Sequence, residues 1–303
     1  MAPQAQPFFL SVAPADLGRR FALYYAPHVV EARGLVVYVH PLAEEMNKSR
    51  RMAALQSRAF AAQGFAVLQI DLLGCGDSAG DFGDATWAQW VSDVADACRW
   101  IRRQHTPPAG TVAPPLWLWG LRVGCLLAAE AAARLEEGCN LLFWQPTLVG
   151  NMALQQFLRL KVAGDMLAGN AKGAVAALRQ QLASGQPAEI AGYILNPALA
   201  DGLEHAVLRP PARPCRADWL EVSATPEGGL APAASRVAEQ WNDAGWDVRT
   251  RVVPGPAFWH TTEVEEAPAL VAATSAALER PQAPNEVAEP AHSNSALLRE
   301  VRS

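Results

Sequence analysis

Residues 116–124 read LWLWGLRVG, and this stretch decides the fold. It begins as a run of large apolar side chains, which is typical of a strand buried on both faces of a parallel sheet. The run then enters Gly-Leu-Arg-Val-Gly, where two glycines flank a central Arg122. Glycines at this spacing allow a sharp strand-to-helix turn that presents one side chain above the carboxyl edge of a sheet.

The stretches on either side of this turn alternate between strand and helix patterns. Apolar runs predict strands, and each is followed by a segment with helical spacing of its apolar residues. Such alternation predicts a mostly parallel, doubly wound α/β sheet with helices on both faces. The predicted strands are 8–12, 19–26, 34–40, 66–72, 116–121, 140–145, 217–223 and 247–253, and the predicted helices of the core are 48–63, 86–104, 124–137, 232–245 and 262–278.

One segment interrupts the alternation. Residues 151–212 are helical in pattern and end in a proline-rich stretch, so we expect a helical cap inserted over the strand ends. The core is then expected to comprise residues 1–150 and 213–279. Residues 280–303 are rich in Pro, Ala, Glu, Asn and Ser, a composition that predicts a disordered tail.

Composition narrows the classes of function. The 303 residues carry a formal net charge of −5, without the basic stripe that a nucleic-acid partner requires. Five cysteines without CxxC spacing favour reduced thiols and a cytoplasmic protein. We recognise no signal peptide and no apolar run long enough to span a membrane, and we expect neither a cofactor nor a metal. The sequence leaves the oligomeric state open.

The Gly-Leu-Arg-Val-Gly turn corresponds to the nucleophile elbow GxSxG of the α/β-hydrolase fold, with Arg122 in the place of serine. No Ser or Thr occurs between residues 112 and 146 that a shift of register would bring into place. Cys125 lies one turn further on, where we favour a buried structural thiol. The sequence therefore has the pattern of the fold but lacks its usual serine nucleophile.

The loop after the strand 34–40 begins His40-Pro41-Leu42-Ala43. In this fold the loop supplies one backbone N–H to an oxyanion hole, and the residue after the nucleophile supplies the other. Because Pro41 lacks an N–H, we expect Leu42 or Ala43 to donate, together with Val123. His40 either orients this loop or contributes to the site. Glu44 and Glu45 are either site residues or a solvated pair at a helix start.

The strand 66–72 leads into Asp71-Leu-Leu-Gly-Cys-Gly-Asp-Ser78, a DxxGxGxS turn found in many α/β-hydrolases. Asp71 and Ser78 are expected to hydrogen-bond this loop beside the site. After the last strand comes Trp259-His260, where the fold places its catalytic base. The acid should follow the strand 217–223, and Glu227 is the candidate there, although a plain surface glutamate fits as well.

The charge of Arg122 limits what surrounds it. An arginine remains protonated in proteins and cannot act as a nucleophile. A guanidinium at the bottom of an apolar pocket therefore needs a carboxylate, an anionic ligand, or both. We expect Glu44 or Glu45 to be that carboxylate, and an anionic substrate group to compete with it.

The segments VVYVHPLAEEMNKSRRM, DLLGCGDSAGDFGDATWAQW, LWLWGLRVGC and NLLFWQP together resemble one family, the second of the two hydrolases associated with exosortase A systems. The resemblance covers most of residues 5–265. It implies an α/β-hydrolase-like protein of an exopolysaccharide system. It also implies a small-molecule acyl ester or thioester, or an acyl-carrier-bound group, as the substrate.

Two functions remain open at this point. In one, the chain is a hydrolase or acyl transferase in which His260 activates water and Arg122 clamps an anion or oxyanion. In the other, it is a catalytically inactive acyl- or lipid-binding protein that kept the pocket.

Overall fold

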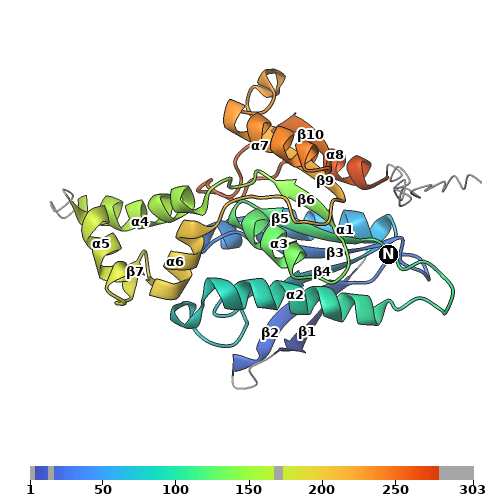
Figure 1. Cartoon of the computed structure of the whole chain (residues 1–303), viewed down its shortest axis with the longest axis horizontal. Coiled ribbons are helices and arrows are strands. Elements are labelled where there is room, and N and C mark those ends of the chain that lie inside the picture. The colour runs from blue at the N-terminus through green and yellow to red at the C-terminus, as the bar shows by residue number, and fades with distance from the viewer. Residues whose placement is uncertain (1–3, 13–16, 167–172, 280–303) are drawn as a thin grey trace, which may run out of the picture.

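The computed structural model describes residues 4–12, 17–166 and 173–279, and they form a central sheet between two layers of helices (Figure 1). The sheet has eight strands in the order β1-β2-β4-β3-β5-β6-β9-β10. Strand β2 pairs antiparallel with both of its neighbours, β1 and β4, and every other neighbouring pair in this sheet is parallel. The strands are β1 (Ala5–Ser11), β2 (Arg19–Tyr25), β3 (Gly34–Val39), β4 (Phe65–Ile70), β5 (Leu116–Leu121), β6 (Asn140–Trp144), β9 (Arg216–Ser223) and β10 (Asp247–Pro254).

The apolar runs of the sequence become the central strands because both faces of the sheet are covered. Every residue of β3, β5 and β6 is buried. Alternate side chains of β5 enter different layers, so that Leu116 and Leu118 pack on one face, and Trp117 and Trp119 pack on the other. The strand therefore needs bulky apolar residues throughout rather than at every second position.

Helices α2 (Trp87–Gln104), α3 (Val123–Ala133) and α7 (Pro232–Asp243) cover one face of the sheet. Helices α1 (Glu44–Ala62) and α8 (Pro268–Glu279) cover the other face and contact each other. Because α1 follows β3 and α3 follows β5, both helices begin at the carboxyl edge of the sheet. This edge is where ligands bind in open α/β folds.

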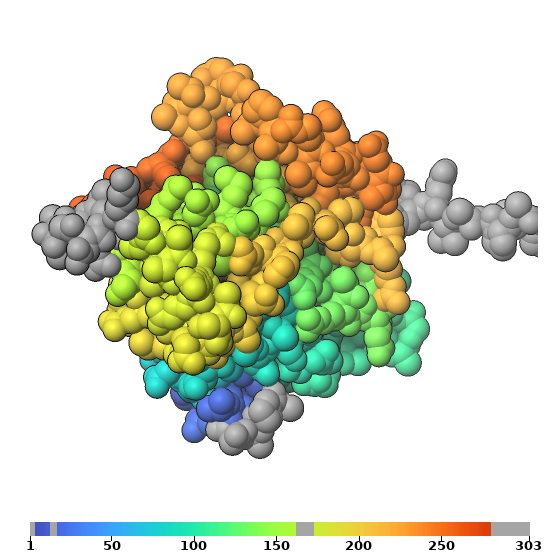
Figure 2. All heavy atoms as spheres, turned by 60° about the vertical axis from the view of Figure 1, so that its left-hand side comes forward, coloured from blue at the N-terminus to red at the C-terminus, as the bar shows by residue number. Residues whose placement is uncertain are grey.

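A helical insertion separates β6 from β9 and projects from the core on the left of Figure 1. It contains α4 (Gly150–Met166), α5 (Ala174–Ala183), the hairpin β7 (Ala188–Ile190) and β8 (Tyr193–Leu195), and α6 (Pro197–His205). The hairpin contacts the short helix η2 (Phe82–Asp84), and α6 contacts α2. Figure 2 shows the yellow residues of the insertion lying over the blue-green residues of the core.

This is the α/β-hydrolase fold that the sequence predicts. The eight core strands occur where expected, with small shifts such as β1, which spans Ala5–Ser11 rather than residues 8–12. The hairpin within the insertion was not predicted. The expected disordered tail, residues 280–303, lies outside the described residues. Within the described ranges, none of the helices combines the length and apolar character needed to cross a bilayer.

Candidate functional site

The turn between β5 and α3 is a strained elbow with Arg122 at its apex. Arg122 has φ 56° and ψ −118°, a region that residues with a side chain rarely adopt. A Cβ on Gly124 would lie 2.2 Å from the carbonyl oxygen of Val39, and one on Gly120 would lie 2.6 Å from the backbone of Cys125. Both glycines are therefore required for the helix to start this close to the sheet.

A second turn of the same shape lies next to it. After β3, Ala43 has φ 50° and ψ −122°, and α1 begins at the next residue. The first turn of α1 carries Glu44 and Glu45. The two strand-to-helix turns thus bring Arg122 and Glu45 into contact, although they are 77 residues apart in the sequence.

The Arg122 guanidinium lies among three side chains. Its Nε is 3.4 Å from Oε1 of Glu45, and its Nη2 is 3.4 Å from the amide oxygen of Gln156 on α4. Its Cζ lies 5.6 Å from the centre of the Trp259 ring, which is a cation–π distance. The Arg122 and Glu45 side chains are 17% and 16% exposed, so the pair is largely but not fully withdrawn from water.

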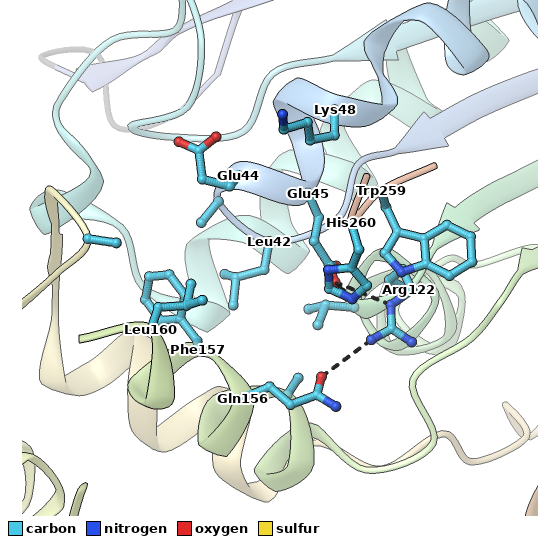
Figure 3. A pocket seen from close by; sticks show the side chains of 14 residues that line it. Leu42, Glu44, Glu45, Lys48, Arg122, Gln156, Phe157, Leu160, Trp259 and His260 are labelled. Carbon is cyan, nitrogen blue, oxygen red and sulfur yellow. Dashed lines mark hydrogen bonds and ion pairs between the residues drawn. The ribbon is translucent and has the colours of Figure 1, made fainter. Parts of the chain in front are cut away.

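The same Glu45 oxygen contacts His260. Nε2 of His260 lies 3.1 Å from Oε1 of Glu45, and the His260 side chain is 57% exposed (Figure 3). Burial raises the pKa of Glu45, and the charge of Arg122 opposes this rise. Burial also lowers the pKa of His260, and Arg122 lowers it further. His260 is therefore biased toward the neutral form that can accept a proton.

These side chains line a cavity of about 310 Å³ between the carboxyl edge of the sheet and α4. Arg122 and Trp259 lie on one side of it, and Phe157 and Leu160 lie on the other (Figure 3). The remaining lining residues come from the two turns, the first turns of α1, helix α4, the hairpin tip and the loop after β10: Leu42, Ala43, Glu44, Glu45, Lys48, Val123, Ala153, Gln156, Ala191 and His260.

A match to known proteins agrees with this architecture. A family model described as serine aminopeptidase, S33 (Hydrolase_4), matches residues 30–209, more than half of the chain. This chain belongs to that family. It is an α/β hydrolase by family and by fold. No curated protein matches it.

Solved structures share the fold of this S33-family chain at low sequence identity. Est1E from Butyrivibrio proteoclasticus with bound ferulic acid is 14% identical, with a TM-score of 0.57 over 86% of this chain and 94% of that one. A thermostable carboxyl esterase from Bacillus coagulans in complex with glycerol is 18% identical, with a TM-score of 0.54 over 84% and 91%. XC6422 from Xanthomonas campestris, an α/β serine hydrolase without a lid, is 16% identical, with a TM-score of 0.53 over 93% of this chain and 97% of that one.

Within this S33-family fold, the structure brings together most residues expected at the site. Arg122, His260, Trp259, Glu44 and Glu45 line the cavity, as do Leu42, Ala43 and Val123. The expected carboxylate partner of Arg122 is confirmed and is Glu45. Glu44 instead accepts a hydrogen bond from the Tyr193 hydroxyl at 2.7 Å. No hydrogen bond from the N–H of Leu42, Ala43 or Val123 occurs among the turns and caps of the described residues.

Four residues expected to line the site do not reach the cavity. His40 is buried, and its two ring nitrogens contact the Pro41 carbonyl and the Leu72 N–H, at 2.8 and 3.3 Å. Asp71 pairs with Arg50, and the Ser78 hydroxyl donates to the backbone oxygen of Asp71. These three residues stabilise loops beneath the site.

Cys125 is the fourth, and it is fully buried. Its thiol lies 3.7 Å from the Trp144 carbonyl, and burial raises its pKa well above the ordinary value. It does not point into the cavity, so it does not replace the missing serine.

Glu227 is not the partner of His260. It is exposed on the short helix η3 (Pro226–Gly228) and makes no hydrogen bond or ion pair within the described part of the chain. On β9 itself, the carboxylate of Glu221 accepts a hydrogen bond from Trp219 Nε1 at 2.7 Å. His260 instead meets Glu45, which comes from the first turn of α1.

The wall that the insertion supplies was not predicted from the sequence. Ala153, Gln156, Phe157 and Leu160 line the cavity from one face of α4. Their spacing of three and four residues is that of a helix face, which was visible in the sequence. Within the described residues, no group of three or more His, Cys, Asp or Glu side chains is arranged to hold a metal ion.

Proposed function

We propose that this α/β hydrolase cleaves an acyl ester or thioester by activating water directly, without a covalent acyl-enzyme. The observation that carries the proposal is the contact between His260 Nε2 and Glu45 Oε1, at 3.1 Å, on the wall of the cavity. When Glu45 is ionised, its carboxylate only accepts, so Nε2 must carry the proton. The lone pair then resides on Nδ1, where it can take a proton from water.

The reaction follows from these roles. Nδ1 of His260 removes a proton from water as the water oxygen attacks the acyl carbon. The bond from the acyl carbon to the leaving oxygen of an ester, or to the leaving sulfur of a thioester, then breaks. The leaving alcohol or thiol takes a proton back from the imidazolium. Glu45 stabilises the imidazolium through Nε2, and Arg122 offsets the charge of Glu45. The N–H groups of Leu42 or Ala43 and of Val123, residues that line the cavity, would receive the developing oxyanion.

The resemblance to the exosortase A-associated family supports a finer version of this proposal. The substrate would be a small-molecule acyl group or one carried on an acyl carrier, within an exopolysaccharide system. The five cysteines form no disulfide, which supports a cytoplasmic location. The two units proposed are the core, residues 1–150 and 213–279, and a cap, residues 151–212.

One observation favours a second candidate, a binding protein without turnover. Arg122 occupies the elbow, and the thiol of Cys125, three residues further on, is buried among apolar side chains. A serine protease that loses its nucleophile still accelerates hydrolysis about 10³–10⁴-fold over the uncatalysed reaction in water. A pocket that retained its walls but lost its chemistry would show ligand binding alone.

Turnover separates the two candidates. Short- and medium-chain acyl esters and thioesters are incubated with the wild type, His260→Ala and His205→Ala. His205 is an exposed histidine on α6 that also pairs with a carboxylate, and it provides the matched control. Loss of the general base should lower kcat/KM by about 10²–10⁴-fold in His260→Ala only. Equal background hydrolysis in all three proteins would favour the binding protein.

A further inference from the structure

The terminal nitrogens of Arg122 have few hydrogen-bond acceptors among the described residues. A guanidinium has five N–H donors, yet the side chain makes only two hydrogen bonds among the described residues, both 3.4 Å long. Charge-assisted hydrogen bonds are usually about 2.7–2.9 Å. Nη1 has no partner among these residues, and Nη2 has only the amide of Gln156. The outer edge of the guanidinium is therefore available to a ligand in the cavity.

The guanidinium is also held in one orientation. The elbow fixes the backbone of Arg122, its Nε lies against Glu45, and the Trp259 ring lies near the face of the guanidinium. A planar fork that is already oriented matches the two oxygens of a carboxylate or phosphate. The neighbouring charges are engaged elsewhere: Lys48 donates to the Thr262 carbonyl at 2.7 Å, and Glu44 accepts from Tyr193.

The far side of the cavity is apolar. Leu42, Ala153 and Phe157 are buried, whereas Leu160 remains 47% exposed beside them. Figure 3 shows Phe157 and Leu160 across the cavity from the Arg122 guanidinium. The cavity therefore has guanidinium donors left unoccupied by the described residues at one end and an aliphatic side opposite them.

We propose that this cavity binds a single-chain anionic amphiphile, with its head group on the terminal nitrogens of Arg122 in place of Gln156 and its chain along Leu42, Phe157 and Leu160. Glu45 stays on Nε, so its contact with His260 persists in the complex. The carboxylate released from an acyl ester or thioester belongs to this class. The inference rests on the proposed function only in taking the same cavity as the site.

Calorimetric titration of the full chain tests this with decanoate and decyl phosphate below their micelle concentrations, and with decanol below its solubility limit. Decanoate is expected to bind more tightly than decanol, and comparison with decyl phosphate identifies the preferred head group. Affinity should rise about fourfold per methylene from hexanoate to decanoate, because each buried methylene contributes a fixed increment. Arg122→Met should weaken decanoate binding roughly 10- to 150-fold, which is the range for a hydrogen bond to a charged group.

Variants on α4 locate the ligand. Gln156→Leu should bind decanoate at least as tightly as the wild type, because Gln156 only occupies the head-group position. Ala153→Phe fills the apolar side and should remove the gain from hexanoate to decanoate. Met152→Phe adds the same ring at the neighbouring residue, which is 63% exposed and outside the cavity, and should change nothing.

Equal binding of decanoate and decanol would overturn the proposal, as would equal effects of Ala153→Phe and Met152→Phe. The second comparison does not involve Arg122, so it decides even if Arg122→Met fails to fold. The titrations do not depend on turnover. Binding of decanoate without hydrolysis of any ester would therefore refute the proposed function and support this inference. Hydrolysis without a preference for anions would support the proposed function and refute this inference.

Discussion

The pairing of Arg122 with Glu45 makes a definite prediction about stability and pH. Arg122→Met removes the charge and keeps a side chain of similar length, so the strain of the elbow is unchanged. The carboxylate of Glu45 then loses the guanidinium that pairs with it while remaining largely buried. Removing one partner of a fully buried pair costs about 3–5 kcal/mol, whereas exposed pairs contribute about 0–1 kcal/mol.

The geometry places this pair between those limits. Both side chains are about one-sixth exposed, and they share a single contact of 3.4 Å. We therefore expect the free energy of unfolding to fall by about 1–2 kcal/mol at neutral pH. For a chain of this size, this is a fall in Tm of about 2–6 °C.

The effect should depend on pH because burial raises the pKa of Glu45 in the folded protein. A carboxyl group whose pKa is raised by folding stabilises the protein while protonated, and this contribution is lost as the pH rises through the folded pKa. Without Arg122 the pKa of Glu45 rises further. The difference between variant and wild type should therefore be small near pH ~4, where Glu45 is protonated in both, and should grow toward pH ~7.

Thermal denaturation followed by circular dichroism across this range measures the difference. Arg51→Met is the control, because Arg51, on α1, likewise pairs with a glutamate, Glu266, but the two side chains are 61% and 36% exposed. The control should change Tm little at any pH. If the two variants lose the same stability, or if the loss in Arg122→Met does not change with pH, the pairing with Glu45 is not a buried one.

Three further outcomes are expected. Gly124→Ala should unfold the elbow or cost several kcal/mol in chemical denaturation, because its Cβ would lie 2.2 Å from a backbone oxygen of β3, whereas Gly228→Ala, with nothing within 4 Å, should be neutral. The imidazole of His260 should titrate below its ordinary pKa in NMR spectra, and Arg122→Met should move the pKa upward. An aqueous thiol reagent should modify the half-buried Cys215 first and spare Cys125 until the protein unfolds.

The core of the fold was predictable because its signals are local. A strand buried on both faces needs an uninterrupted apolar run, and β3, β5 and β6 each have one. The hairpin of β7 and β8 escaped prediction because each strand has only three residues. Its turn at Ala191-Gly192 also places a non-glycine residue at positive φ, which the sequence does not signal.

The site was predictable only in part. A buried cation requires a counter-charge, and the loop after β3 lies beside the elbow, so the two together point to Glu44 or Glu45. The partner of His260 does not follow in this way, because the usual chain order of the fold places the acid after β9. Glu45 reaches His260 from the first turn of α1, and such a contact depends on side-chain directions that a linear pattern does not contain. The spacing of the α4 residues was visible in the sequence, but the cavity that this helix face lines was not.

The twin turns at Ala43 and Arg122 have an electrostatic consequence of their own. Each starts a helix at the carboxyl edge of the sheet, so the amino ends of α1 and α3 both begin beside the cavity. The aligned peptide dipoles of a helix place roughly half an elementary positive charge at its amino end. Two such ends supply about one positive charge that no side-chain substitution can remove. A chain without Arg122 would still offer an anion a favourable potential here, built into the backbone itself.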